Sequence, residues 1–348
     1  MNWDMFYNNN NCKIEEKISC LGPKIKKIDL KDKKILYFLD LNSRESYRSI
    51  GKKVGLSKDV VASRVKKLKD NGVITNFHTA VDYCLLGFTS FRFYLNFQYV
   101  TEEIKNDIVN YFINEKYIKF IHSTEGSFDF SLIAHAKDIS KIYFIWEKVL
   151  SKYRDYFANQ VFSAVYKTSV FCFSFLLDES DEERKSRKSY DLMSKGKIIH
   201  IDKTDLNILK QIIVNARMPT VEIAKNLDST PTVINYRINK LIKSGVIIGF
   251  KTSINFSKIG YRLFKVDINL KDHRILDKII EYVMINPNLF EVIKSVGYSD
   301  VELVYILKNV KDLHEIIADI SKKFPDKIKN YTYFVVVKSH KWEFLPEE

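Results

Sequence analysis

The chain contains an internal repeat that spans most of its length. A shift of 173 positions aligns residues 28–77 with residues 201–250 without a gap. Matched identical pairs include Ile28 and Ile201, Asp32 and Asp205, Ile35 and Ile208, Asn42 and Asn215, Arg44 and Arg217, Arg64 and Arg237, and Gly72 and Gly245. A repeat determines how many modules must each bury a core, so it constrains the architecture more than any single motif. We therefore predict a tandem duplication.

After each of these segments the apolar pattern changes. In residues 91–97 apolar residues alternate with polar ones, and residues 264–270 do the same. A period of two is typical of a half-buried strand. Helical patterns lie between the strands, at about 101–115 and 138–153 in the first copy and about 274–285 and 310–323 in the second. The order predicts an α+β fold with two ferredoxin-like βαββαβ modules.

The repeat and the composition together give domain boundaries. We predict a poorly ordered leader at 1–27, helical domains at 28–77 and 201–250, βαββαβ domains at 78–177 and 251–348, and a charged linker at 178–200. The linker is rich in Lys, Arg, Asp and Glu and poor in apolar residues, which is typical of a solvated connection.

Several classes of protein are disfavoured by the sequence. No apolar run approaches the length of a membrane span, and the polar N-terminus has no signal segment, so we predict a cytoplasmic protein with no membrane partner. The four cysteines form no C-x-x-C pair, and the seven histidines have no metal-binding spacing. Glycine-rich phosphate loops and G-x-S-x-G are also absent. We predict no catalytic residue, no metal and no cofactor.

The excess positive charge is concentrated in the two helical segments. The chain carries a net charge of +13. Residues 28–77 hold 12 basic and 6 acidic side chains, and residues 201–250 hold 7 and 4. The βαββαβ segments are almost neutral, with 10 of each sign in residues 78–177, and 16 basic against 14 acidic in residues 251–348. A Lys-rich surface without function would spread the excess evenly, so this distribution favours a polyanionic partner.

Each basic segment predicts three short helices. The first two are expected at 32–41 and 46–54, and at 205–214 and 219–227. A third helix is expected to begin after Ser57 or Thr230, either of which can cap it, and to end at the glycine of the Gly-Val-Ile triplet. Three short helices of which the last two are joined by a tight turn form a helix-turn-helix.

The third helix has one apolar face and one exposed face in both copies. Val61, Val65 and Leu68 share a face in the first copy, and Ile234, Ile238 and Leu241 share one in the second. We predict that the opposite faces read base edges, Asn235 and Asn239 by bidentate pairing with adenine, and that the flanking cations contact phosphates. The predicted DNA-binding residues are Ser57, Lys58, Asp59, Ala62, Ser63, Arg64, Lys66, Lys67, Thr230, Thr232, Asn235, Tyr236, Arg237, Asn239 and Lys240.

Both halves resemble the Lrp/AsnC (feast/famine) family of transcription regulators. The resemblance rests on four short motifs, Ile-Asp, Ile-Leu, Asn-x-Arg and Gly-Val-Ile, which occur in both 28–74 and 201–247. It implies two winged helix-turn-helix domains. Each is followed by a connecting strand and then by a ferredoxin-like ligand-binding domain, called RAM (regulation of amino acid metabolism). The connecting strands are expected at about 76–82 and 249–255. Family members usually carry one copy per chain and pair through their RAM sheets. We therefore expect the two copies to pair as an intrachain pseudodimer bound to double-stranded DNA, with further homo-oligomer formation left open.

The same resemblance suggests where an amino-acid effector would bind. In the family this site lies near a Gly-x-x-Asp hairpin, which here comprises Gly126 and Asp129 in one copy and Gly297 and Asp300 in the other. A second interpretation is a tight hairpin in which the glycine adopts a positive φ and the aspartate caps the turn. We favour this structural interpretation.

One enzymatic alternative remains open. Siroheme decarboxylases, enzymes of haem biosynthesis, resemble Lrp/AsnC proteins and occur as pairs of dissimilar subunits, which a fusion could join. The basic helical segments and the lack of an obvious Arg and His cluster for propionate carboxylates favour a regulator, so we predict that the chain is not an enzyme. A third class is a regulator of other proteins that has lost DNA binding.

Overall fold

The computed structural model describes residues 25–177, 184, 187–194 and 196–346. Most of the predicted leader, 1–24, and residues 178–183 of the predicted linker lie outside the described residues. The helices are α1 (Leu30–Leu41), α2 (Tyr47–Val54), α3 (Lys58–Asp70), α4 (Glu102–Asn114), α5 (Ile139–Tyr153), α7 (Lys203–Val214), α8 (Thr220–Asn226), α9 (Pro231–Lys243), α10 (Leu276–Val283) and α11 (Val310–Lys323). The strands are β1 (Ile74–Val81), β2 (Thr89–Phe97), β3 (Ile118–Gly126), β4 (Phe130–Ala136), β5 (Phe157–Phe171), β6 (Ser189–Met193), β7 (Ile247–Ile254), β8 (Arg262–Leu270), β9 (Leu289–Val296), β10 (Val301–Leu307) and β11 (Ile328–Trp342). No described helix has the length and apolar character to cross a membrane.

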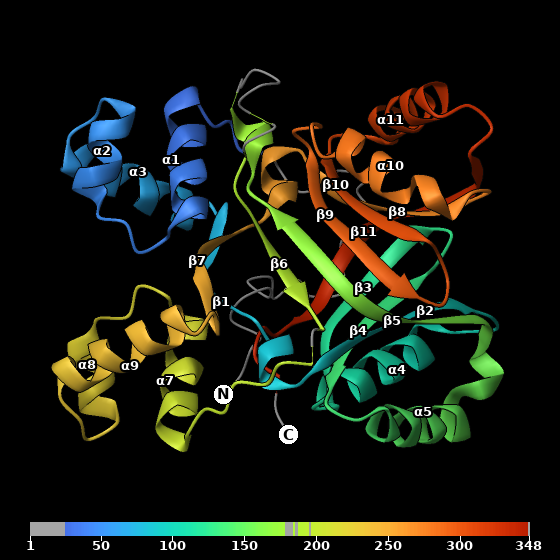
Figure 1. Ribbon diagram of the computed structural model, residues 1–348, viewed down its shortest axis with the longest axis horizontal. Coiled ribbons are helices and arrows are strands. Elements are labelled where there is room, and N and C mark those ends of the chain that lie inside the picture. Colours follow the sequence, from blue (N-terminus) through green and yellow to red (C-terminus); the bar gives the residue numbers. More distant parts are fainter. Residues whose placement is uncertain (1–24, 178–183, 185–186, 195, 347–348) are drawn as a thin grey trace.

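The duplicated architecture is visible at the level of whole domains. Helices α1 to α3 and α7 to α9 form two helix-turn-helix units on one side of the molecule, and the sheets occupy the other side (Figure 1). Asp29 caps α1 and forms a capping box with Asp32, and Asp202 caps α7 by accepting from the backbone amide of Asp205. The predicted α+β fold with tandem helix-turn-helix and ferredoxin-like domains is confirmed.

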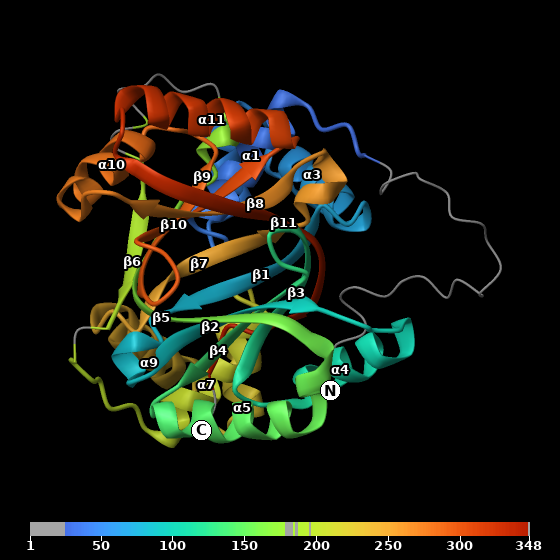
Figure 2. The same cartoon turned by 90° about the vertical axis from the view of Figure 1, so that its right-hand side faces the viewer.

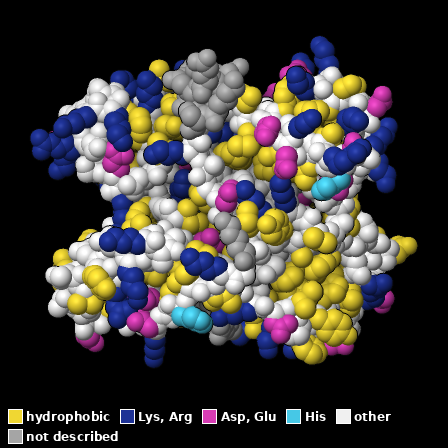
Figure 3. Space-filling model, in the orientation of Figure 1, with side chains coloured by type: hydrophobic (Ala, Val, Ile, Leu, Met, Phe, Trp, Pro, Cys, Tyr) yellow, Lys and Arg dark blue, Asp and Glu magenta, His cyan; other side chains and the backbone are white. Residues whose placement is uncertain are grey.

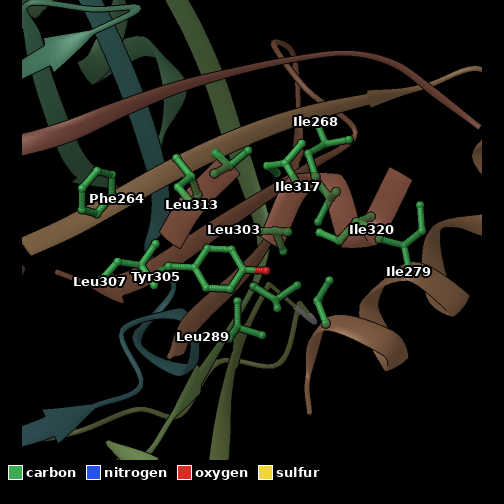
Figure 4. Packing of buried hydrophobic residues seen from close by; sticks show 14 of the residues in the cluster. Phe264, Ile268, Ile279, Leu289, Leu303, Tyr305, Leu307, Leu313, Ile317 and Ile320 are labelled. Atoms are coloured by element: carbon green, nitrogen blue, oxygen red, sulfur yellow. The ribbon is translucent and has the colours of Figure 1, made fainter. Parts of the chain in front are cut away.

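Each half folds its four sheet strands in the ferredoxin-like order. In the first half β5, β2, β4 and β3 lie side by side, and in the second half β11, β8, β10 and β9 do so. Helices α4 and α5 cover the outer face of the first sheet, and α10 and α11 cover that of the second (Figure 1). Figure 4 shows the core of the second half, where Leu303 and Tyr305 of β10 pack against Leu313, Ile317 and their neighbours on α11.

The two sheets join into one closed sheet. Strand β3 of the first half pairs with β11 of the second, and β9 pairs with β5. Because β5 also pairs with β2, the eight strands form a ring in which each strand has two neighbours. A closed sheet leaves these strands without the unpaired edges that promote aggregation.

Closure buries both faces of the central strands. The alternating residues of β2 were expected to form a half-buried strand, yet Arg92 is only 7% exposed and Tyr94 is fully buried. Their counterparts on β8, Lys265 and Asp267, are buried as well. The reason is that the face opposite the helices packs against the sheet of the other half, so both faces of each central strand are covered.

The connecting strands hold the helix-turn-helix units together. Strands β1 and β7 pair with each other in antiparallel register, with Phe77 opposite Thr252 (Figure 2). Helix α1 packs on β7 and helix α7 packs on β1, so the first helix of each unit lies on the connecting strand of the other half. Thr79 of β1 donates to the carbonyl of Ile212 in α7 over 2.7 Å. Each helix-turn-helix therefore completes its core with residues of the other half.

Part of the predicted linker forms a strand. Strand β6 pairs with the distal part of β5, with Ser169 opposite Asp191. The hydroxyl of Ser169 also donates to the Asp191 carboxylate over 2.7 Å. The connection between the halves is therefore attached to the sheet over these five residues.

Candidate nucleic-acid interface

The third helix of each unit begins at the predicted capping residue. Ser57 Oγ accepts from the backbone amide of Val60, and Thr230 Oγ1 accepts from that of Val233, each over 3.3 Å. A cap satisfies one of the free amides at a helix start. Pro231 occupies the first turn of α9, where a missing amide costs nothing. Both predicted starting points of the third helix are confirmed.

The predicted division into buried and exposed faces is present in both third helices. The apolar faces of α3 and α9 are buried, as predicted. Tyr236 is 70% exposed and has the largest side chain on the exposed face of α9. The exposed predicted residues are Ser57, Lys58, Asp59, Ser63, Lys66, Lys67, Thr230, Thr232, Asn235, Tyr236, Asn239 and Lys240, whereas Ala62, Arg64 and Arg237 are half-buried. Lys and Arg side chains gather over these units on the left of Figure 3.

Arg64 and Arg237 have partners within the protein. Arg64 Nη1 lies 2.8 Å from a carboxylate oxygen of Asp29 and 2.8 Å from one of Asp32. Arg237 Nη1 makes the same pair of contacts with Asp202 and Asp205, at 2.7 and 2.8 Å. The hydrogen bond from Arg237 lowers the pKa of Asp202. These guanidinium groups connect the third helix of each unit to the start of its first helix. A DNA phosphate would therefore compete with the carboxylates for the same guanidinium groups.

The Asn-x-Arg triplets connect the two units across the junction. Arg44 Nε donates to the carbonyl of Ala216, and Arg217 Nη1 donates to the carbonyl of Ser43. Arg44 also lies over the ring of Phe250 at 4.3 Å, and Arg217 lies over that of Tyr47 at 4.4 Å. Each arginine is therefore held by the other half. No role was predicted for these two arginines from the sequence, although both recur at matching positions of the repeat.

The backbone around the junction repeats this crosswise pattern. The amide of Ser43 donates to the carbonyl of Phe250 over 2.8 Å, and the amide of Ala216 donates to that of Phe77 over 2.7 Å. The turn after the first helix of each unit is thus bonded to the connecting strand of the opposite half. These bonds connect the two helix-turn-helix units to each other.

The predicted effector residues lie where the two halves meet. Gly126 has a φ of +121° and Gly297 a φ of +135°, and a Cβ at either would lie 2.6 Å from a carbonyl oxygen of the other half, that of Tyr333 or Phe162. Asp129 accepts from the backbone amide of Phe97 over 2.8 Å. Asp300 accepts from that of Leu270 over 2.7 Å. The positive φ agrees with the favoured hairpin interpretation, but the carboxylates bond to the neighbouring strand instead of capping the turn.

Two open grooves lie on the described surface. One of about 550 Å³ lies beside α3 and is lined by Lys27, Ile28, Asp29, Asp32, Val60, Ser63, Arg64 and Lys67. A second, of about 380 Å³, lies between β5, β6, β9 and α10. Among the described residues no group of three or more His, Cys, Asp and Glu is arranged to bind a metal.

Comparison with known proteins identifies relatives of each half and of the whole fold. A winged helix-turn-helix DNA-binding family matches residues 28–75 and 201–248. The regulatory protein AsnC of Haemophilus influenzae is 30% identical over 120 residues, which are 34% of this chain and 80% of that protein. The HTH-type transcriptional regulator Ptr1 of Methanocaldococcus jannaschii is 33% identical over 123 residues, 35% of this chain and 82% of that protein.

A solved structure matches nearly the full length of the chain. The siroheme decarboxylase NirDL, in complex with an iron-uroporphyrin III analogue, superimposes with a TM-score of 0.61 over 91% of this chain and 94% of that one, at 11% sequence identity. The similarity shows a shared fold. It contradicts the prediction that the chain is not an enzyme, because an enzyme has this full-length architecture.

Proposed function

The chain belongs to the Lrp/AsnC family of transcription regulators, and we propose that it is a sequence-specific DNA-binding regulator in which one chain acts as a pseudodimer. The observation that carries the proposal is the pair of capped third helices, α3 and α9, with exposed polar faces. Because DNA is the proposed partner, the proposed location is the cytoplasm. The domain boundaries set out from the sequence are part of this proposal.

Pairing within the chain is supported by the contacts between the halves. Strand β1 pairs with β7, and Arg44 and Arg217 bond across the junction. A family dimer presents two recognition helices from two chains, and here one chain offers both. Linking two modules also raises their effective concentration for each other, which favours intrachain over interchain pairing.

The two recognition faces differ, so the proposed operator is asymmetric. The face of α9 carries Asn235 and Asn239, which suit adenine, whereas that of α3 carries Ser63 and Lys66. Operator palindromy normally reflects twofold protein symmetry. Two unlike helices held in one frame would read two unlike half-sites.

Selection of bound sequences from a random duplex pool tests this proposal. We expect two different half-sites at a fixed spacing, with the mass of the protein in solution measured alongside. A clean palindrome would mean that identical helices from two chains read the half-sites, and the intrachain arrangement would have to be abandoned.

The charge distribution supports the DNA partner and gives a second test. Neutralising several phosphates releases counterions, so affinity should fall steeply between low and physiological salt. Mobility shifts over that range measure the slope. A correctly folded protein with no salt-dependent DNA affinity would favour the third class, a regulator of other proteins.

Although we favour a structural role for the hairpins of Gly126 and Gly297, we also propose a test of the alternative, in which an amino-acid effector acts there. Both hairpins contact the other half, so a ligand bound there would change the contact between the halves. A thermal-shift screen with the twenty amino acids, repeated on Asp129→Ala and Asp300→Ala, tests this. A response that both variants retain would place any effector elsewhere.

Tetrapyrrole decarboxylation is the second candidate function. The observation that favours it is the full-length similarity to a siroheme decarboxylase. Addition of siroheme should then change its absorption spectrum, and incubation should release carbon dioxide. The two candidate functions can be distinguished by mutation, because Asn235→Ala and Asn239→Ala should impair DNA binding and leave decarboxylation unchanged.

A further inference from the structure

The closed sheet encloses a cluster of charged side chains. Arg92 projects from β2, Lys265 and Asp267 from β8, and Glu302 from β10. Their exposed fractions are 7%, 5%, 1% and 0%. Charged residues are rarely buried unless they are paired, because transfer of an ion out of water is costly.

Glu302 is the centre of this cluster. Its Oε2 lies 3.2 Å from Arg92 Nη1 and 3.0 Å from Lys265 Nζ. Ser295 donates to the other oxygen over 2.7 Å. Burial acts to raise the pKa of Glu302, but Lys265 and Arg92 outweigh it and hold that pKa below its usual range. Lys265 also forms an ion pair with Asp267. The contact between Arg92 and Glu302 joins the first half to the second.

Strand register shows which residues of the two halves are equivalent. On β2 and β4, Arg92 lies opposite Ile133 and Tyr94 lies opposite Ser131. On β8 and β10, Lys265 lies opposite Val304 and Asp267 lies opposite Glu302. Arg92 therefore corresponds to Lys265, Tyr94 to Asp267, and Ser131 to Glu302. Both halves contribute one cation, and only the second half contributes carboxylates from these positions.

Among these buried residues the charges balance only when unlike halves pair. Glu291, which is half-buried, lies 4.0 Å from Arg92 as a further carboxylate of the second half. A first half paired with another first half would bury two copies of Arg92 with tyrosine and serine in place of the carboxylates. Two second halves would bury two lysines against four carboxylates. The observed pair buries Arg92 and Lys265 against Asp267 and Glu302.

We propose that this buried cluster is a pairing code that makes the first half bind the second half and reject a copy of itself. A buried charge without a partner is strongly destabilising, so like pairs lose far more than the observed pair gains. The inference concerns pairing alone, and it holds whether the paired halves bind DNA or a tetrapyrrole.

Charge reversal in the full-length chain tests the code. Arg92→Glu leaves one cation against three carboxylates, and Glu302→Arg leaves three cations against one. We expect either substitution to lower the melting temperature by about 10 °C, and the double variant to recover most of that loss. Lys278→Glu, which reverses an exposed charge on α10, is the matched control and should change neither melting temperature nor mass.

Mixing the two single variants gives the decisive measurement. In an exchanged dimer, the first half of the Arg92→Glu chain pairs with the second half of the Glu302→Arg chain, so the reversed charges face each other. The other two halves, which are unmutated, pair with the wild-type charges. When the variants are refolded together, one of them labelled with ¹⁵N, native mass spectrometry should show a one-to-one exchanged dimer far above the level in a wild-type mixture.

Two results would overturn the proposal. One is a double variant whose loss of melting temperature equals the sum of the losses of the two single variants. The other is a mixture of the single variants that forms no exchanged dimer. If the reversals prove insoluble, the neutral pair Arg92→Met with Glu302→Gln replaces them. Without the code this variant should gain dimers joined through like halves, and a mass distribution equal to that of the wild type would refute the code.

Discussion

Arg44 and Arg217 occupy the same position of the two repeats and reach across the junction in opposite directions, each donating to a backbone carbonyl in the turn of the other unit. This reciprocal contact commits two side chains of the Asn-x-Arg triplets to the junction between the two helix-turn-helix units. It also explains why a residue type associated with phosphate binding recurs at a half-buried position.

Replacement of both arginines should loosen the spacing between the recognition helices. Arg44→Met with Arg217→Met leaves the part-buried carbonyls of Ala216, Ser43 and Glu45 without these donors, at a cost of about 1–3 kcal/mol each. Affinity should fall for a duplex with both half-sites and change little for a duplex with one. Fluorescence anisotropy with the two duplexes measures the difference. Arg48→Met, which removes an exposed cation of α2, is the control, and equal losses on both duplexes would argue against a spacing role.

Substitutions on the exposed faces should separate base reading from phosphate contact. Asn235→Ala and Asn239→Ala should each reduce discrimination among sites by about 1–3 kcal/mol for a lost bidentate contact. Lys67→Ala and Lys240→Ala should weaken all sites alike and flatten the salt dependence. Competition binding against specific and random duplexes distinguishes them. If the asparagine variants weaken both duplexes equally, the base-reading face has been misassigned.

Buried histidines predict a loss of stability in mild acid. Burial lowers the pKa of His78, His122 and His135 to about 3 each. In the unfolded chain a histidine titrates near 6.5, so between about pH 6.5 and 3 the unfolded state binds more protons. The free energy of unfolding should therefore decrease as the pH is lowered through that window, by about 1.4 kcal/mol per pH unit for each histidine. Asp40, whose pKa burial raises, contributes with the opposite sign.

His135 isolates this effect. Its ring stacks on Tyr83 at 4.1 Å, and its Nδ1 has no hydrogen-bond partner among the residues that the structure describes. His135→Phe should reduce the slope of unfolding free energy between pH 6 and 5 by one histidine's share. Urea titrations at several pH values give the slope, with the exposed His200→Gln as control. An unchanged slope would mean that His135 titrates alike in both states.

Glycine at the hairpins should be indispensable for contact between the halves. Gly126→Ala meets both a positive φ and a carbonyl oxygen 2.6 Å from the new Cβ. We expect a loss of at least about 1–3 kcal/mol from backbone strain alone. Gly249→Ala, where the new Cβ has no described neighbour within 4 Å, is the control. Thermal unfolding compares the two, and equal stability of the variants would show that the hairpin can move away from β11.

Local signals made the helix-turn-helix units predictable. Capping by Ser57 and Thr230 and the apolar face of each third helix depend on residues a few positions apart, and these predictions were confirmed. The role of Arg44 could not be predicted, because its partner Ala216 is brought near only by the pairing of the halves. The burial of Arg92 and Tyr94 escaped prediction for the same reason, since an alternating strand looks alike whether water or a second sheet covers its polar face.

Covalent union of the halves changes how the recognition surface can diverge. In a dimer of identical chains every substitution occurs twice, so both half-sites must change together. Here α3 and α9 are encoded separately, while each unit still builds its core on the connecting strand of the other. A single mutation can thus change recognition of one half-site and leave recognition of the other unchanged. A promoter and its regulator can therefore co-evolve one half-site at a time.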